Sequence, residues 1–355
     1  MGNKVKYKIT VILTFYNLAS VLFETLASLE KQNCKLVEVV LIDDGSTDLS
    51  LAIAKSFLVR NIDWRCISIP NQGVSHARNF GLTLAKGEYV LFLDGDDVLR
   101  EGLLDELKEA CNNSADVVVF RSRELDHVTS LSISLSWSIR KKYIPKKNTF
   151  HPSELKGHIF YSFMGWPWDK LFKIEFLQKN KLSFPSFHNS EDLVFVYKAL
   201  VLSDKINILE KELIFHRVNR NSSLSNTLIK APDEFKKSLC EMEAFIKNNP
   251  IIFSREKSCF YAWMIDYYLW GVKNTREEIS KNEMRLLLDW YEKCKGSKNL
   301  FPFLRARILL MSNNFIPSKI KLLIFHVYQM PRYGFKRVCF RLISFIFRFV
   351  IKLKV

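Results

Sequence analysis

The first part of the chain alternates short apolar runs with longer segments whose apolar residues recur at helical spacing. The apolar, β-branched runs have the length of buried strands and cover 8–15, 37–42, 66–69 and 88–93. The helical segments between them cover 18–31, 49–58 and 74–85. Strands that alternate with helices predict right-handed βαβ units. The fold class is therefore α/β, with a mostly parallel central sheet flanked by helices.

Polar clusters follow these predicted strands at 14–17, 43–48, 71–73 and 94–97. The carboxyl ends of parallel strands meet at one edge of the sheet, and ligands bind outside that edge. We therefore expect a binding site built from these clusters.

After residue 100 the pattern of apolar and polar residues changes. A helix at 103–111 and a strand at 116–120 are followed by a polar, weakly periodic excursion over 122–149. Ser190 precedes another apolar helix, and residues from about 230 to 300 have an all-helical pattern. The sequence thus predicts a helical C-terminal region after the sheet.

Two acidic turns, Asp43-Asp44 and 94–97, follow strands of the same predicted sheet. Neighbouring carboxylates repel one another unless a cation or hydrogen-bond donors join them. Mg²⁺ and Mn²⁺ take oxygen ligands and often bridge to substrate phosphates. Asp and Gly also simply form turns, but the position of both clusters at strand ends favours a cation–phosphate site.

Four ordered segments resemble family 2 glycosyltransferases, which are inverting enzymes with the GT-A (Rossmann-like) fold. They are 9–17, 39–48, 71–79 and 85–97. The resemblance is strong over 7–120 and looser over 160–225. It implies a hexosyl- or N-acetylhexosaminyl-type transferase that moves a sugar from a nucleotide-sugar, most simply a UDP-sugar, to a growing, lipid-linked surface glycan.

The resemblance also assigns residues to the nucleotide. Thr14, where the family usually has proline, and Tyr16 would line the nucleotide pocket, and Asp43 or Asp44 would hydrogen-bond the base. Arg78 would either stabilise the nucleotide or anchor the 71–79 turn. His76 is expected to be a structural histidine.

A divalent cation, Mn²⁺ or Mg²⁺, is implied by the same resemblance. Asp94 and Asp96 match the family's DxD element, in which one aspartate contacts ribose or metal. Asp96 is the first choice as metal ligand, and Asp97 is the substitute. His216 would be a further protein ligand.

Inverting transfer needs a base that deprotonates the acceptor hydroxyl and positive charge that stabilises the leaving diphosphate. The segment 190–192 resembles the family's acidic catalytic element, so Asp192 is the expected base and Glu191 the second candidate. A plain helix cap is the alternative, because serine and acidic residues favour helix N-termini.

Residues 215–225 resemble the loop that closes over the diphosphate in this family. Arg217 or Arg220 would pair with phosphate oxygens, and a solvated basic loop is the alternative. Trp166 and Trp168 would offer a flat face to an acceptor sugar, unless they form a packed aromatic core.

Composition and charge refine this prediction. The chain is 48% hydrophobic and 25% charged, as expected of a folded protein, and its net charge is +16. Most of the excess lies in 301–355, which has eleven Lys or Arg and no Asp or Glu. Seven scattered cysteines without a CxxC pair argue against a disulfide framework or zinc site and favour a reducing compartment.

The basic segment near the C-terminus mixes these cations with Phe and Ile. Arg341 and Arg348 lie seven residues apart, near one face of a helix, which suits a helix in a membrane interface. The apolar content argues against a nucleic-acid partner, and packing on the body is the remaining alternative. We find no signal peptide or long apolar span, and expect a cytoplasmic protein peripheral to the inner face of the membrane.

The expected organisation has three parts. Residues 1–225 form the transferase domain, with 1–120 binding the nucleotide-sugar and 121–225 supplying the acceptor side and the base; 226–315 are helical, and 316–355 form the membrane-associating tail. Two other functions were weighed. A nucleotidyltransferase would show a glycine-rich basic loop in place of 14–17. A catalytically silent membrane-bound protein would not need the carboxylates.

Overall fold

A ten-stranded sheet forms the centre of the molecule in the computed structural model, in the order β3-β2-β1-β4-β9-β6-β10-β5, with β7 on β6 and β8 on β10. The structure describes residues 7–59, 61, 63–187, 189–220, 232–275 and 279–294. The predicted tail at 316–355, and the parts of 226–315 beyond these ranges, lie outside the described residues. The strands are β1 Tyr7–Phe15, β2 Val37–Asp43, β3 Trp64–Ser68, β4 Gly87–Asp94, β5 Val98–Leu99, β6 Val117–Asp126, β7 Ser132–Ser134, β8 Thr149–Phe150, β9 Lys170–Lys173 and β10 Ile206–Val218.

The parallel part of the sheet follows the predicted apolar runs. Strands β3, β2, β1 and β4 pair in parallel, and so do β6 and β10. Alternate residues of β1 face opposite sides: Val11 joins one apolar core and Ile12 the other. Helices α1 (Leu22–Glu30), α2 (Ser50–Leu58) and α4 (Leu103–Ala110) cover the first side, while α3 (Val74–Leu84) covers the second. The predicted α/β fold with a helix-flanked sheet is confirmed.

Five strands were not predicted: the short β5, β7, β8 and β9 and the long β10. The short β9 lies antiparallel between β4 and β6 and joins the two parallel groups. The long β10 includes 215–218, so the prediction of a loop beginning at Phe215 is wrong for those residues. Register shifts against β6 between Leu209 and Ile214 interrupt its apolar pattern, which is why it did not resemble a strand. Strand β6 also continues to Asp126, into the predicted excursion.

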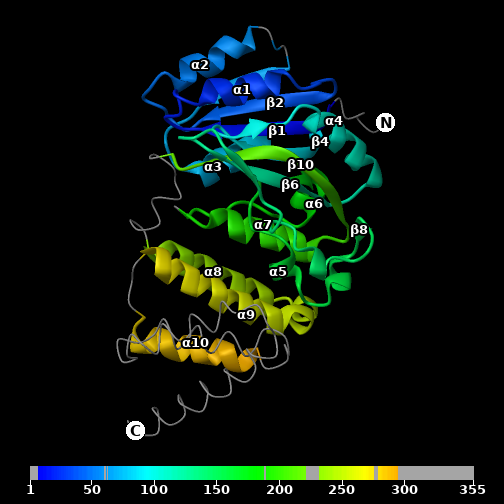
Figure 1. The fold of residues 1–355 in the computed structure, drawn as a ribbon, viewed down its shortest axis with the longest axis vertical. Helices are drawn as coiled ribbons and strands as arrows, with labels where there is room; N and C mark the ends of the chain where they lie inside the picture. The colour runs from blue at the N-terminus through cyan, green and yellow to red at the C-terminus, as the bar shows by residue number, and fades with distance from the viewer. Residues whose placement is uncertain are drawn as a thin grey trace.

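The remaining helices lie on the second side of the sheet and below it (Figure 1). Helix α7 is apolar on nearly every side and is buried between the sheet and α8. The long α9 packs between α8 and α10, so the predicted helical region is present within the described residues. These helices are α5 Ile159–Ser162, α6 Ile174–Lys179, α7 Glu191–Leu202, α8 Pro232–Lys247, α9 Pro250–Thr275 and α10 Lys281–Lys293, with short 3₁₀ turns η1 Cys111–Asn113, η2 Lys141–Tyr143 and η3 Pro152–Leu155.

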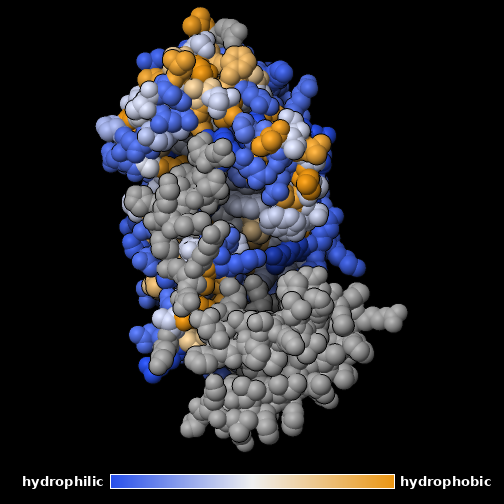
Figure 2. Space-filling view, turned by 60° about the vertical axis from the view of Figure 1, so that its left-hand side comes forward, coloured by the Kyte–Doolittle hydropathy of each residue, from blue (hydrophilic) through white to orange (hydrophobic). Residues whose placement is uncertain are grey.

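Exposed apolar side chains gather at the end of the molecule formed by α1 and α2, uppermost in Figure 2. They include Phe23, Leu49 and Val59. Among the helices that the structure describes, none is both long and apolar enough to span a bilayer.

Candidate active site

The acidic turn after β4 is pressed against the end of β1. The Gly95 amide donates to the Thr14 carbonyl at 3.0 Å, and the Thr25 hydroxyl donates to the Gly95 carbonyl at 3.0 Å. A Cβ on Gly95 would lie 2.8 Å from Phe15 Cβ, too close for two carbons. Glycine between Asp94 and Asp96 therefore lets the turn approach β1, where the predicted nucleotide residue Thr14 lies.

Arg78 connects this turn to the N-terminus of α7. Its guanidinium donates to Asp94 Oδ1 at 2.7 Å and to Glu191 Oε1 at 3.1 Å, and its side chain is only 6% exposed. Burial opposes its charge, but the two carboxylates outweigh burial and raise the Arg78 pKa. These contacts anchor the acidic turn to the helix that carries the candidate base, which differs from both predicted roles, stabilising the nucleotide and anchoring the 71–79 turn.

Asp192 and Glu191 differ in surroundings although they are neighbours. Glu191 is buried against Arg78, whereas Asp192 is half-buried and accepts from the Leu193 amide at 2.7 Å. Burial, reinforced by the charge of Glu191 and opposed by Arg78, raises the Asp192 pKa to about 7. A carboxyl group that titrates near neutral pH suits general-base chemistry.

The helix-cap alternative for this segment holds in part, because Glu191 and Asp192 lie in the first turn of α7, but Ser190 does not cap the helix with its side chain. Ser190 has φ of 63°, and its side chain accepts no hydrogen bond from the amides of α7. Its hydroxyl instead accepts from the Tyr267 hydroxyl at 2.9 Å. The left-handed backbone at Ser190 directs the chain into α7 next to Arg78.

The fully buried Asp97 pairs with the partly exposed His216 beside the acidic turn. His216 Nδ1 lies 2.9 Å from Asp97 Oδ1, which also accepts from the Arg217 amide at 3.1 Å. Burial raises the Asp97 pKa to about 6 against the effect of His216. For His216, burial lowers the pKa, but Asp97 prevails and raises it to about 9. The contact between them fixes the orientation of the His216 ring.

This geometry separates Asp97 from the other two aspartates. Asp97 is fully buried, while the side chains of Asp94 and Asp96 are 25% and 13% exposed. Asp97 Oδ2 has no hydrogen-bond partner among the described residues. Because Asp97 holds His216 at Nδ1, the Nε2 atom of His216 is the nitrogen left for a ligand.

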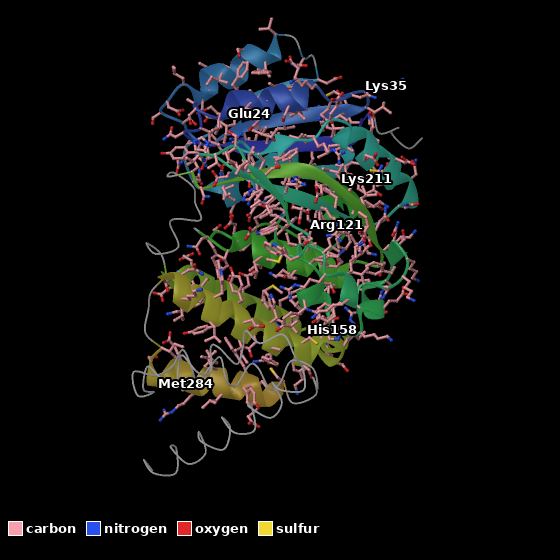
Figure 3. All side chains as sticks on the ribbon, in the orientation of Figure 1. Glu24, Lys35, Arg121, His158, Lys211 and Met284 are labelled. Carbon is pink, nitrogen blue, oxygen red and sulfur yellow. The ribbon has the colours of Figure 1, made fainter. Side chains whose placement is uncertain are left out.

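The two predicted phosphate-binding arginines have different partners. Arg220 donates to Asp96 Oδ2 at 2.7 Å. Arg217 donates to the Asp96 carbonyl at 2.9 Å and to Glu24 Oε2 at 2.6 Å, and so ties β10 to α1, where Figure 3 labels Glu24. The charge of Arg220 therefore lies against the Asp96 carboxylate, whereas Arg217 hydrogen-bonds the backbone of the turn.

Asp43 and Asp44 shape the neighbouring loops. Asp43 is fully buried and accepts from the Ser46 amide at 3.0 Å and the Ser68 hydroxyl at 2.6 Å. Asp44 accepts from the Gln72 and Gly73 amides at 3.0 and 2.9 Å, at the start of α3. Both carboxylates are engaged by protein donors. Tyr16, in contrast, is 46% exposed beyond the end of β1.

The predicted acceptor tryptophans form a stack. The Trp166 and Trp168 rings lie 4.8 Å apart at 16°, and Trp168 stacks on His216 at 4.5 Å and 10°. Trp168 is buried, while Trp166 is half-buried beneath the edge of Trp137. Trp168 thus matches the packed-core alternative and supports His216 from one side.

The sequence did not indicate that Lys170 is a buried structural residue. Its ammonium is fully buried, pairs with Asp169, and donates to the Met164 and Trp166 carbonyls at 2.9 and 2.8 Å. Burial lowers the Lys170 pKa and raises that of Asp169 to about 6. The only sequence signal was an adjacent pair of opposite charges inside an aromatic motif.

No three His, Cys, Asp or Glu side chains converge as a complete metal site within the described part of the chain. Mg²⁺ and Mn²⁺ commonly use one or two carboxylates and complete their shell with substrate phosphates and water. The partly exposed Asp94 and Asp96 and the available nitrogen of His216 fit that kind of incomplete site. Asp97 fits the outer carboxylate that orients a metal-binding histidine.

Comparisons with known proteins agree with this geometry. The model of the family "Glycosyl transferase family 2" matches residues 10–173. The cholesterol galactosyltransferase of Borreliella burgdorferi is 29% identical over 279 residues, 74% of each chain. Glycosyltransferase GlyA of Streptococcus pneumoniae is 32% identical over 224 residues, 61% of this chain and 31% of the longer relative.

Among solved structures, S. aureus TarS 1-349 in complex with UDP-GlcNAc matches with a TM-score of 0.61 and 19% identity, covering 96% of this chain and 91% of that one. At this identity the likeness concerns the fold. Residues 10–173 therefore belong to glycosyl transferase family 2, and the chain is a glycosyltransferase with the GT-A fold.

Proposed function

We propose that this protein transfers one sugar, with inversion, from a UDP-sugar to a growing, lipid-linked surface glycan. The observation that supports the proposal is the Arg78 bridge, which joins the acidic turn to the helix that carries Asp192. The relatives named above include a galactosyltransferase, and the structural neighbour holds UDP-GlcNAc. Galactose, glucose and N-acetylglucosamine are therefore the donor sugars to test first.

In this proposal the donor lies along the carboxyl edge of β1 and β4. Thr14 and Tyr16 line the nucleotide pocket. Asp43 or Asp44 hydrogen-bonds the nucleotide base after one of the protein hydrogen bonds to that carboxylate is released. Arg220 turns from Asp96 toward the diphosphate, where its charge stabilises the leaving group. Arg217 keeps the turn in place through the Asp96 carbonyl.

Asp192 acts as the base in this mechanism. It accepts the proton of the acceptor hydroxyl while that oxygen attacks the anomeric carbon and the bond to the nucleoside diphosphate breaks. Arg78 favours the charged form of Glu191 against the effect of burial and holds the start of α7, so the base keeps its direction. Glu191 is the weaker candidate, because its carboxylate is already bound.

A divalent cation, Mn²⁺ or Mg²⁺, fits beside these residues and would neutralise charge on the diphosphate. We assign Asp96, with Asp94, as its carboxylate ligands and His216 Nε2 as the nitrogen ligand. Asp97, the substitute ligand in the sequence analysis, is assigned instead to orienting His216, since it is fully buried.

The acceptor and the membrane complete the proposal. The segment 121–225 supplies the acceptor side, with the half-buried Trp166 at its edge. The basic segment 316–355 holds the protein on the inner face of the membrane, close to a lipid-linked acceptor. A 1–315 variant that still sedimented with anionic vesicles as the full chain does would contradict the membrane role.

The proposal is tested by UDP release from a panel of UDP-sugars, with methyl glycosides as acceptors and Mn²⁺ present. We expect turnover with one donor and loss of at least about a hundredfold in Asp192→Asn, since general-base catalysis contributes roughly 10²–10⁴-fold. UDP binding should remain in that variant. Full transfer by Asp192→Asn would remove Asp192 as the base, and no turnover or UDP binding by the wild type would reject the function.

A further inference from the structure

Helix α9 carries a row of aromatic side chains on one face. Trp263, Tyr267 and Trp270 recur at helical spacing, and their rings stack in sequence. The Trp263 and Tyr267 centroids lie 5.7 Å apart at 23°, and those of Tyr267 and Trp270 lie 5.2 Å apart at 30°. Exposure rises along the row, from buried Trp263 through half-buried Tyr267 to Trp270, which is 43% exposed.

This row reaches the candidate active site at Tyr267. Its hydroxyl donates to Ser190 Oγ at 2.9 Å, directly before Glu191 and Asp192. Burial raises the Tyr267 pKa against the effect of the Ser190 bond, and the charge of Asp192 raises it further. The Tyr267 hydroxyl therefore lies next to the start of the helix that carries the candidate base. Trp270 lies one helical turn further along α9.

The chemistry of the row suits a sugar ring. A pyranose has an apolar C–H face and a rim of hydroxyls, and binding sites combine flat aromatic surface with a few polar groups. Trp270 supplies the surface, and exposed Lys273 and Asn274 lie one turn further on the same side. The step along the helix from Tyr267 to Trp270 is ~4.5 Å, comparable with one sugar ring.

The two tryptophans expected to bind the acceptor offer less free surface. Trp168 is buried and stacks on Trp166 and His216. Trp166 is half-buried and also contacts Trp137, at 5.4 Å and 68°. Neither ring is as exposed as that of Trp270.

We propose that Tyr267 and Trp270 form the acceptor subsite, on which successive sugar rings of the acceptor glycan stack as they lead away from the hydroxyl that Asp192 deprotonates. This inference rests on the proposed function and deepens it. It moves acceptor recognition from the tryptophan stack near β9 to the helical layer beneath the sheet.

The test is the acceptor dependence of transfer by the full chain, with methyl glycosides and short oligosaccharides of glucose, galactose and N-acetylglucosamine as probes. Trp270→Ala should raise the acceptor KM about tenfold or more, with the longer oligosaccharides affected most, and should leave the donor KM unchanged. Trp270→Phe keeps a ring and should restore most of the affinity, which guards against a folding defect.

Trp137→Ala is the matched control, because Trp137 is 44% exposed and packs on Trp166. We expect its acceptor KM to stay within about twofold of the wild type. An unchanged acceptor KM in Trp270→Ala, or an increase confined to Trp137→Ala, would overturn the inference. A wild-type protein without transfer to any probe and without UDP binding would instead count against the proposed function.

Discussion

Single residues in this site act mainly through the groups that they hold. Gly95 matters for the space that it leaves, since a Cβ would collide with Phe15. Asp97 acts on His216, and Asp44 acts on the amides at the start of α3. Asp192 differs from these, because it is half-buried and its pKa is raised to about 7.

The raised pKa of Asp192 predicts the pH dependence of transfer. A base works in its deprotonated form, so kcat should be constant well above pH 7 and fall as pH drops through about 7, approaching tenfold per pH unit. The reason is burial beside Glu191, which favours the protonated carboxyl. Steady-state rates between pH 5 and 9 with saturating donor provide the measurement.

Glu191→Gln provides the matched comparison for that profile. Removing its negative charge removes one cause of the raised Asp192 pKa, so the acid limb should move to lower pH. An acid limb near pH 4, or one that moves to higher pH in Glu191→Gln, would contradict the assignment of Asp192 as the titrating base.

At the scale of elements, the site depends on three that meet: the turn after β4, helix α3 and the start of α7. Arg78 on α3 joins the other two by ion pairs with Asp94 and Glu191. A buried pair contributes little net stability when intact, but removal of one partner leaves an uncompensated charge. The Arg78 bridge is therefore costly to break.

Arg78→Met should lower the free energy of unfolding by about 3–5 kcal/mol, because the buried Glu191 carboxylate loses its cation. Urea unfolding followed by circular dichroism measures this change. Arg78→Met combined with Glu191→Gln should recover part of the loss. Lys211→Met is the control, since its ion pair with Glu106 is partly exposed to solvent and should cost under about 1 kcal/mol; Figure 3 labels Lys211. If Arg78→Met and Lys211→Met lowered the free energy of unfolding by the same amount, the assignment of Arg78 to a buried bridge would be wrong.

The elements also show what the sequence could predict. Strand β2 was predictable from an apolar run that only Glu38 interrupts, because the strand is buried on both faces. Strand β10 was not, because the charged residues 210–212 and its register shifts break the pattern. The motif residues were found from local sequence, but their partners were not: Asp97 and His216 are 119 residues apart. Only the folded chain shows that Arg217 holds Glu24 and that Lys170 is buried.

In the whole molecule, the sheet and the helical layer contribute different residues to the proposed site. The carboxyl edge of β1 and β4 carries the predicted donor residues, and α7 to α10 lie below the sheet in Figure 1. Asp192 opens the helix between the two layers. This arrangement supports a donor site on the sheet and an acceptor site on the helices, with the sugar passing between them.

Calorimetric titration of UDP tests whether the acidic turn forms a metal-dependent UDP site. We predict measurable UDP binding by the wild type with Mn²⁺, weakened at least about tenfold by chelation of the metal or by Asp96→Asn. Glu106→Gln, remote from the turn, should bind as the wild type does. UDP affinity that neither chelation nor Asp96→Asn changes, or no UDP binding under any condition, would contradict the account.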